Sequence, residues 1–182
     1  ILMNLQYFLQ EYLKARPLFL SLIRSKEAVL YQKYLPFKSP ILDVGCGDGF
    51  FANITFGGSQ IDVGLDVENS RLEEARKSDI YKKLITYDGG KIPFPSRSFQ
   101  TIISNCVLEH IGNLEFTVKE IYRVLRPGGI FLTTVMAKPW EDNLFGVKLF
   151  GEFYKRWMRE KQIHNNLLTK VQWDKIFEQC GF

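Results

Sequence analysis

Cysteine is scarce in this 182-residue sequence, and long apolar runs are missing from it. The three cysteines, Cys46, Cys106 and Cys180, are odd in number and form no CxxC motif, which argues against a disulfide framework or a zinc site and is compatible with a reducing cytoplasm. No apolar run approaches the roughly 18 residues that a transmembrane helix needs, and residues 1–3 do not begin a secretory signal. We therefore expect a cytoplasmic protein without a transmembrane segment.

A strong charge imbalance is missing as well. The net charge is +4, and the densest basic cluster, Lys155, Arg156, Arg159 and Lys161, lies among aromatic residues. A phosphate-binding footprint needs a denser basic stripe, so we interpret the cluster as a solvated helix face and expect no nucleic acid partner. The hydrophobic content of 46% is ordinary and is enough for a domain with its own core.

Strand-like and helical segments alternate through the middle of the sequence. The expected strands are residues 41–45, 61–66, 84–87, 101–104 and 130–135. The expected helices between them are residues 49–56, 69–77 and 114–126, the last stopped by the Arg-Pro-Gly-Gly segment 126–129. This order predicts an α/β fold: a Rossmann-like, doubly wound, mostly parallel sheet with helices on both faces.

The two flanks of this core carry helical patterns of their own. Pro17 divides the first flank into two helices, and Thr169 is the expected N-cap of the last one. A further strand would be expected beyond Phe182, so we expect the final strands of the sheet to be missing from this sequence. We divide the chain into an N-terminal helical cap (1–38), a ligand-binding core (39–137), a helical insertion that caps the substrate (138–165) and a C-terminal helix of the core (166–182).

The most informative segment is the glycine turn, residues 43–50, which follows the first strand. Its glycines at positions 45, 47 and 49 let backbone approach a ligand closely. A dinucleotide fingerprint would have its third glycine where Phe50 stands, and a phosphate loop would need a Gly-Lys-Ser/Thr end. Asp43, just before the turn, disfavours a phosphate and favours a cation. The turn therefore predicts a site for S-adenosylmethionine, whose ammonium and sulfonium groups are cationic.

Two later acids extend this interpretation. Asp66 ends the second strand, 21 residues after Gly45, where it could accept hydrogen bonds from both hydroxyls of a ribose. It could also be the N-cap of the helix that begins near residue 69. Asp88, followed by Gly89 at the end of the third strand, could accept from an adenine amine, although Asp-Gly is also common in plain turns.

Together these segments resemble the class I SAM-dependent methyltransferase family, and more narrowly its bacterial members that act on small molecules. The resemblance covers residues 40–136 and rests on five motifs in the family's order: 43–50, 63–66, 88 with 92–95 and 98–99, 104–111, and 123–129. It implies cofactor contacts at Asp43, Gly45, Cys46, Gly47, Gly49, Asp66, Val67, Asp88, Gly89 and Asn105. Gln100 departs from the family, which commonly has an acid there, with little expected effect on the cofactor.

The implied reaction is an in-line displacement at a methyl group on cationic sulfur, with S-adenosylhomocysteine as product. Such a reaction depends on placing the nucleophile about 3 Å from the methyl group, and on a general base only if the nucleophile must lose a proton. His110, after the fourth strand, is the candidate base, although it could also be a helix-start or packing histidine; His164 is a weaker candidate. Glu109 precedes His110, but no further acid or histidine cluster supports a metal, so we expect none.

The acceptor is the least determined part of the function. Aromatic residues in 1–35 and 138–165 suggest a small apolar or ring-containing acceptor such as a lipid or quinone, but they could simply form the core of a cap. A SAM-binding protein without transferase activity is the alternative function. A nicotinamide-dependent oxidoreductase is disfavoured by the glycine spacing, and the oligomeric state stays open.

Overall fold

The centre of the molecule is a five-stranded parallel sheet. The computed structural model describes residues 4–68, 71–138, 140, 144–162 and 164–182. Its strands are β1 (Ile41–Val44), β2 (Ile61–Val67), β3 (Tyr81–Tyr87), β4 (Phe99–Asn105) and β5 (Leu125–Thr134). They lie in the order β3-β2-β1-β4-β5, and every neighbouring pair is parallel. The predicted α/β fold with a doubly wound parallel sheet is therefore confirmed.

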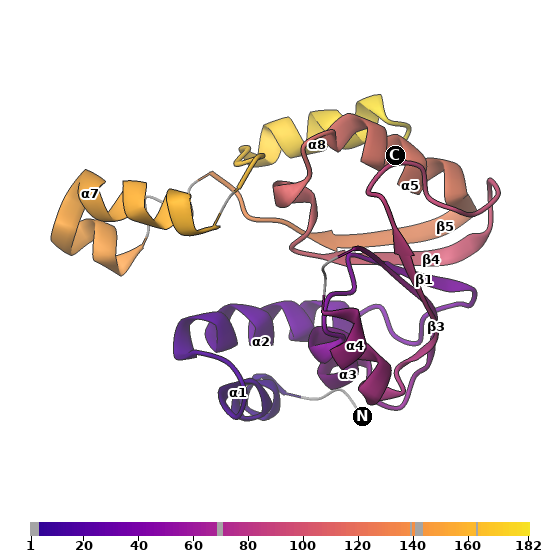
Figure 1. Cartoon of the computed structure of the whole chain (residues 1–182), viewed down its shortest axis with the longest axis horizontal. Coiled ribbons are helices and arrows are strands. Elements are labelled where there is room, and N and C mark those ends of the chain that lie inside the picture. The colour runs from indigo at the N-terminus through magenta and orange to yellow at the C-terminus, as the bar shows by residue number, and fades with distance from the viewer. Residues whose placement is uncertain (1–3, 69–70, 139, 141–143, 163) are drawn as a thin grey trace.

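Helices cover both faces of this sheet (Figure 1). One face carries α1 (Leu5–Leu13), α2 (Leu18–Gln32), α3 (Phe50–Phe56) and α4 (Leu72–Ala75), which continues into the short η1 (Arg76–Ser78). The other face carries α5 (Leu114–Val124), which follows the short η2 (Leu108–His110), and α8 (Lys170–Gln179). None of the described helices is both long and apolar enough to cross a bilayer.

The strands are apolar on both sides because both sides are covered. In β1, Leu42 and Val44 lie in the core that α5 and α8 close, whereas Ile41 lies in the core on the α2–α3 face, with Tyr31 and Phe56. Asp43 alternates with Leu42 and Val44, so its carboxyl points to the same face as Ile41 and is buried there. The fold thus places one acid inside an otherwise apolar layer.

The N-terminal helices form a hairpin that packs on α3. As predicted, Pro17 separates them, and the second helix ends at Gln32. Phe8 and Tyr12 from α1 and Ala28 from α2 make a third buried cluster, against Phe50, Phe51 and Ile54 of α3. The hairpin is therefore anchored directly on the helix that follows the glycine turn.

The insertion and the C-terminal segment differ in how they meet the core. α7 (Phe145–Gln162) projects away from the sheet (Figure 1), and Gly151, with φ 59° and ψ −145°, breaks it into two helical parts. α8 begins after Thr169, which caps it as expected in a capping box with Gln172. The predicted segments 1–35, 69–77 and 138–165 include positions 1–3, 69–70, 139, 141–143 and 163, which lie outside the described residues.

The predicted boundaries are wrong at the start of β3 and at the junction of α5 with β5. β3 begins at Tyr81 rather than at residue 84. Tyr81 pairs with Ile61 of β2, and the strand continues through Lys82 and Lys83 even though both side chains are exposed. The helix predicted to run to residue 126 ends at Val124, and β5 begins at Leu125, which pairs with Phe99. The segment predicted as a stop between helix and strand is thus an irregular start of β5, where the register shifts.

Candidate functional site

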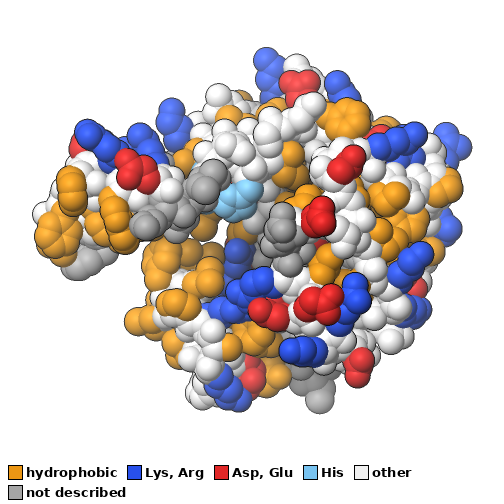
Figure 2. Space-filling model, viewed as in Figure 1, with side chains coloured by type: hydrophobic (Ala, Val, Ile, Leu, Met, Phe, Trp, Pro, Cys, Tyr) orange, Lys and Arg blue, Asp and Glu red, His pale blue; other side chains and the backbone are white. Residues whose placement is uncertain are grey.

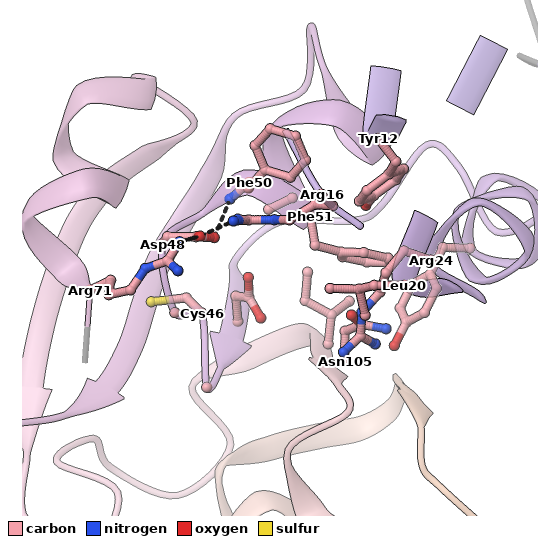
Figure 3. Close-up of a pocket in the computed structure, with 16 residues that line it drawn as sticks. Tyr12, Arg16, Leu20, Arg24, Cys46, Asp48, Phe50, Phe51, Arg71 and Asn105 are labelled. Atoms are coloured by element: carbon pink, nitrogen blue, oxygen red, sulfur yellow. Dashed lines mark hydrogen bonds and ion pairs between the residues drawn. The ribbon is translucent and has the colours of Figure 1, made fainter. Parts of the chain in front are cut away.

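A cavity of about 290 Å³ lies at the carboxyl ends of the central strands (Figure 3). The strand order reverses between β1 and β4, and in doubly wound sheets ligands bind outside the strand ends at this switch point. The glycine turn and the start of α3 form one wall of the cavity, and the α1–α2 hairpin forms the opposite one. Its lining includes Tyr12, Arg16, Leu20, Arg24, Asp43, Gly45, Cys46, Gly47, Asp48, Phe50 and Asn105.

Two glycines of the turn have different reasons to be glycine. Gly45 has φ +76°, and a Cβ on it would lie 2.3 Å from Cγ2 of Val107. Packing therefore requires a glycine there. Gly47 has φ +54°, and a Cβ on it would meet no atom within 4 Å. Gly47 therefore presents bare backbone to open space in the cavity wall, as a ligand held close to backbone would require.

Asp43 is the buried acid of the cavity. It is 6% exposed, and its Oδ2 accepts a 2.6 Å hydrogen bond from the Tyr81 hydroxyl. The pKa of its carboxyl is raised from 3.8 to about 7: burial is the main cause, the charge of Asp66 adds to it, and the Tyr81 hydrogen bond opposes both. A cation bound nearby would favour the ionised form, so the site is built to gain from a positively charged ligand.

Asp66 connects the glycine turn to the tip of β2. Its Oδ2 accepts a 2.6 Å hydrogen bond from Gly47 N–H, and its Oδ1 accepts a 2.7 Å bond from Val67 N–H. Burial raises the pKa of this carboxyl, and these two N–H donors oppose the shift. Each oxygen has a second acceptor position, so Asp66 can still receive hydroxyl groups.

A second hollow, of about 590 Å³, lies over the tips of β2 and β3. It is lined by Val67, Glu68, Thr86, Tyr87 and Asp88. Asp66 lies between the two hollows, because its partners Gly47 and Val67 line one each. Oδ1 of Asp88 accepts from Gly90 N–H at 2.9 Å, a contact typical of a turn.

Three arginines surround the cavity, and no local motif marks them in the sequence. Arg16 and Arg71 both pair with Asp48, which also accepts from Phe50 N–H at 3.0 Å (Figure 3). The Arg16 guanidinium lies 4.5 Å from the centre of the Phe50 ring. Arg24 lines the same cavity from α2. The α1–α2 hairpin thus brings cations to a site whose floor is acidic.

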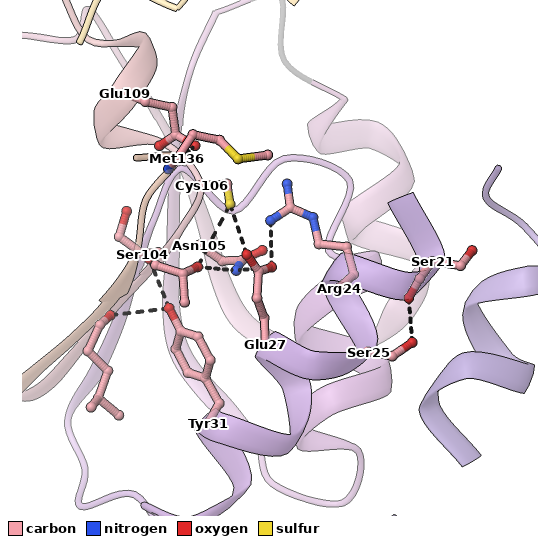
Figure 4. Close-up of polar contacts among 12 residues, drawn as sticks. Ser21, Arg24, Ser25, Glu27, Tyr31, Ser104, Asn105, Cys106, Glu109 and Met136 are labelled. Atoms are coloured by element: carbon pink, nitrogen blue, oxygen red, sulfur yellow. Dashed lines mark hydrogen bonds and ion pairs between the residues drawn. The ribbon is translucent and has the colours of Figure 1, made fainter. Parts of the chain in front are cut away.

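A polar network lies where α2 approaches the end of β4 (Figure 4). Oε2 of Glu27 accepts from Arg24 Nη1 at 2.7 Å and from Asn105 Nδ2 at 3.0 Å, and Oε1 accepts from Cys106 Sγ at 3.2 Å. Burial raises the pKa of the Cys106 thiol. This network fixes the Asn105 side chain at the cavity wall and links the hairpin to β4.

The candidate base His110 lies outside this cavity. It is exposed at the end of η2, and its ring lies against His164, with centroids 4.9 Å apart. Glu109 beside it is fully buried; its Oε1 accepts from Met136 N–H at 3.3 Å, and burial raises the pKa of its carboxyl. Among the described residues, no group of three or more His, Cys, Asp or Glu could hold a metal ion.

The structure therefore brings most of the predicted cofactor residues together. Asp43, Gly45, Cys46, Gly47 and Asn105 line one cavity. Val67 and Asp88 line the second hollow, and Asp66 joins the two. Gly49 caps α3 beside the cavity, and Gly89 lies next to Val67, whose Cγ1 would be 3.5 Å from an added Cβ. Sequence reasoning missed Arg16, Arg24, Glu27, Arg71 and Tyr81.

The chain is similar in sequence or in fold to known methyltransferases. The chain is 33% identical over 109 residues to a demethylmenaquinone methyltransferase of Symbiobacterium thermophilum, covering 55% of this chain and 43% of that protein. It is 32% identical over 117 residues to a malonyl-[acyl-carrier protein] O-methyltransferase of Legionella pneumophila, covering 61% and 40%. The crystal structure of a putative methyltransferase from Bacillus halodurans superposes with a TM-score of 0.68 at 25% identity, over 86% of this chain and 69% of that one.

The chain spans about two fifths of the length of these two sequence relatives. Residues 42–133, just over half of the chain, match the profile of the family described as "Methyltransferase domain". This match begins in β1, includes the glycine turn and all ten predicted cofactor residues, and ends in β5. The chain therefore belongs to the methyltransferase domain family.

Proposed function

We propose that this protein is an S-adenosylmethionine-dependent methyltransferase that moves a methyl group to a small-molecule acceptor. The observation that carries the proposal is the buried Asp43 beside the open backbone of Gly47, at the switch point of a methyltransferase-family fold. A buried acid with a raised pKa is costly unless a cation compensates it, and a bare glycine is useful where a ligand touches backbone. Both features fit the same ligand.

The residues of the site fit the parts of the cofactor. Asp43 would face the cationic end, and Asp66 would accept from the ribose hydroxyls. Val67 and Asp88 line the hollow of about 590 Å³ that would receive the adenine. Arg16 and Arg24 line the cavity opposite the glycine turn and would pair with the carboxylate of the methionine end. Asn105, held by Glu27 and by Thr134 Oγ1 at 2.6 Å, would bound the methyl end.

The chain's contribution to the reaction is mainly placement. The bound cofactor would supply an electrophilic methyl group on a cationic sulfur. The α1–α2 hairpin lines the cavity opposite the glycine turn and would limit the access of water to the reacting groups. The role of His110 as a general base stays a prediction, and it applies only to an acceptor that must lose a proton.

The nature of the acceptor is the open part of the proposal. The two sequence relatives are named for demethylmenaquinone and for a malonyl-carrier protein, and the flanks of this chain are rich in aromatic residues. We therefore propose an apolar or ring-containing acceptor. A cytoplasmic location is part of the same proposal, and the three free cysteines are compatible with it.

Calorimetric titration with S-adenosylhomocysteine and, separately, with NAD tests the ligand. We expect S-adenosylhomocysteine to bind and NAD not to bind; the reverse result would contradict the proposal. Transfer is tested by methyl release from labelled S-adenosylmethionine over a panel of quinones, phenols and fatty acyl thioesters. Cofactor binding without transfer to any of them would favour the alternative, a SAM-binding protein that lacks transferase activity.

A further inference from the structure

The projecting helix α7 carries apolar side chains that the proposed cofactor site does not use. Leu149 is 61% exposed, Phe150 65% and Phe153 78%, and Trp157 is exposed as well. Single exposed apolar residues are normal on a protein surface. Here four large ones lie within nine positions of one element that stands away from the core (Figure 1).

The fold of α7 holds these side chains as a group. A Cβ on Gly146 would lie 2.4 Å from the Tyr154 ring, so the part of α7 before Gly151 packs tightly against the part after it. The Tyr154 ring lies 6.4 Å from Phe150 and 5.7 Å from Trp157, measured between centroids. Phe153 and Trp157, four residues apart, share one side of the second part. The internal packing of α7 therefore uses Tyr154 and leaves its neighbours at the surface.

The other side of α7 is basic. The helix contains five Lys and Arg residues against two Glu residues, and Lys148 and Arg156 are exposed. Figure 2 shows the basic side chains along one side of the projecting helix and the hydrophobic ones along the other. Basic residues on one side with Phe, Leu and Trp on the other are the composition of helices that lie in the interface of a membrane.

We propose that α7 docks this protein on the surface of a lipid bilayer that carries anionic headgroups. Phe150, Phe153 and Trp157 enter the boundary between headgroups and acyl chains, and the basic residues meet the anionic headgroups. A second copy of this chain would cover the apolar side alone, whereas an anionic bilayer would also engage the basic residues. With its charges, α7 lies on a membrane and does not cross it.

The docking surface and the α1–α2 hairpin project on the same side of the molecule (Figure 1). Figure 2 shows the molecule hollowed between α7 and the α1–α2 hairpin, with hydrophobic side chains on the hairpin side of the hollow. On α2, Leu18, Phe19 and Leu22 are exposed, while Leu20 and Arg24 line the cofactor cavity. An acceptor with an apolar chain or ring could pass from the bilayer along this hollow. This last step rests on the proposed function, whereas the docking itself depends only on α7.

Vesicle sedimentation tests the docking. The full chain is mixed with vesicles of phosphatidylcholine and phosphatidylglycerol in equal amounts, or of phosphatidylcholine alone. We expect the wild type to bind the anionic vesicles, with an affinity that falls as salt is added. The affinity of Phe150→Ser/Phe153→Ser should be lower by roughly tenfold or more. The matched control Val171→Ser, at a 75% exposed position of α8, should bind like the wild type.

Two double variants that remove positive charge test the electrostatic contribution to vesicle binding. Lys148→Ala/Arg156→Ala should lose the preference for anionic vesicles, whereas Lys119→Ala/Lys170→Ala, at exposed positions of α5 and α8, should keep most of it. Should the Phe double variant fail to fold, the fluorescence of Trp157 replaces it. Wild-type emission should shift to the blue on anionic vesicles and that of Trp157→Phe should shift much less, because Trp173 is already buried and Trp140 is only partly exposed.

Three results would overturn the docking proposal. The first is a folded wild type that does not bind anionic vesicles; the second is binding that the α7 variants leave unchanged. The third is a wild-type dimer, measured by light scattering, that Phe150→Ser/Phe153→Ser converts to a monomer, because the apolar side of α7 would then belong to a second copy. Titration with S-adenosylhomocysteine is run on every variant, so that loss of the proposed function is read separately from loss of docking.

Discussion

Replacing Asp43 by Asn removes the buried charge at the end of β1 while keeping the size of the side chain. The pKa of this carboxyl is raised from 3.8 to about 7, mainly by burial and in smaller part by the charge of Asp66. At about 1.4 kcal/mol for each tenfold change in proton affinity, ionised Asp43 destabilises the folded chain by up to about 4 kcal/mol. The amide oxygen can still accept from the Tyr81 hydroxyl, so Asp43→Asn changes the charge without losing that contact.

The sign of the pH dependence follows from this raised pKa. The folded state holds the Asp43 proton more tightly than the unfolded chain does, so the free energy of unfolding falls as pH rises from about 4 to about 7 and then levels off. Asp43→Asn should match the wild type near pH 4 and exceed it by up to about 4 kcal/mol near pH 8. Urea unfolding followed by circular dichroism across this range measures the difference.

Cofactor binding should respond in the opposite direction. A cationic ligand favours the ionised carboxyl, so the affinity of the wild type for S-adenosylmethionine should rise with pH up to about 7. Near pH 8, Asp43→Asn should bind about 10- to 100-fold more weakly, the loss expected for a hydrogen bond to a charged group. Calorimetric titration at each pH gives both the affinity and its pH dependence.

Asp62, near the start of β2, provides the control substitution. Although burial alone would raise its pKa, hydrogen bonds from Lys82 and from Ile41 N–H lower it overall. Asp62→Asn should therefore lower the stability at neutral pH and leave the affinity for the cofactor unchanged. Wild-type affinity in Asp43→Asn at every pH would refute the cation role of Asp43. A loss of stability near pH 8 in that variant would refute the argument from burial.

Three further substitutions test other parts of the site. Asp66→Ala should weaken S-adenosylhomocysteine binding about 10- to 100-fold, since the ribose loses its acceptor; unchanged affinity in a titration would contradict the ribose role. Gly45→Ala should lower the free energy of unfolding by about 2–3 kcal/mol, because of φ +76° and the Val107 contact. Gly112→Ala is the control in the same denaturation assay: an added Cβ there would meet no atom within 4 Å, so the free energy of unfolding should change by less than about 1 kcal/mol. Arg16→Ala should weaken binding of S-adenosylmethionine more than binding of 5′-methylthioadenosine, which lacks the carboxylate; equal losses in the two titrations would argue against that pairing.

The sheet was predictable where burial on both faces leaves a plain apolar run. β1 and β4 carry such runs and were found within two residues at either end. β3 lies at the edge of the sheet, so Lys82 and Lys83 can be exposed within it. Because of these two lysines, the sequence at the start of β3 cannot be distinguished from that of a loop. At the start of β5, Arg-Pro-Gly-Gly has the composition of a turn, and only the pairing of Leu125 with Phe99 makes it part of a strand.

The same distinction applies to the site. The glycine turn and Asp66 could be predicted because strand ends and glycine spacing are local in the sequence. Glu27 and Asn105 are 78 residues apart, and Arg16 and Asp48 are 32 apart. Their contacts exist because Phe8, Tyr12 and Ala28 pack the α1–α2 hairpin on α3. No pattern within either segment encodes that packing, so the cationic half of the site became visible only in the folded chain.

The two halves of the site have opposite charge, and this arrangement explains why both are needed. Asp43 and Asp66 sit at the strand ends, whereas Arg16 and Arg24 come from the hairpin on the other side of the cavity. A ligand with a cationic sulfur, an ammonium group and a carboxylate can satisfy both sides at once, and a dinucleotide, with only anionic groups between its sugars, cannot. Arg16 is already paired with Asp48, so a bound carboxylate must share or replace that contact. Discrimination between ligands therefore depends on where their charges lie. The buried Asp43 disfavours a phosphate at the position where dinucleotide-binding folds hold one.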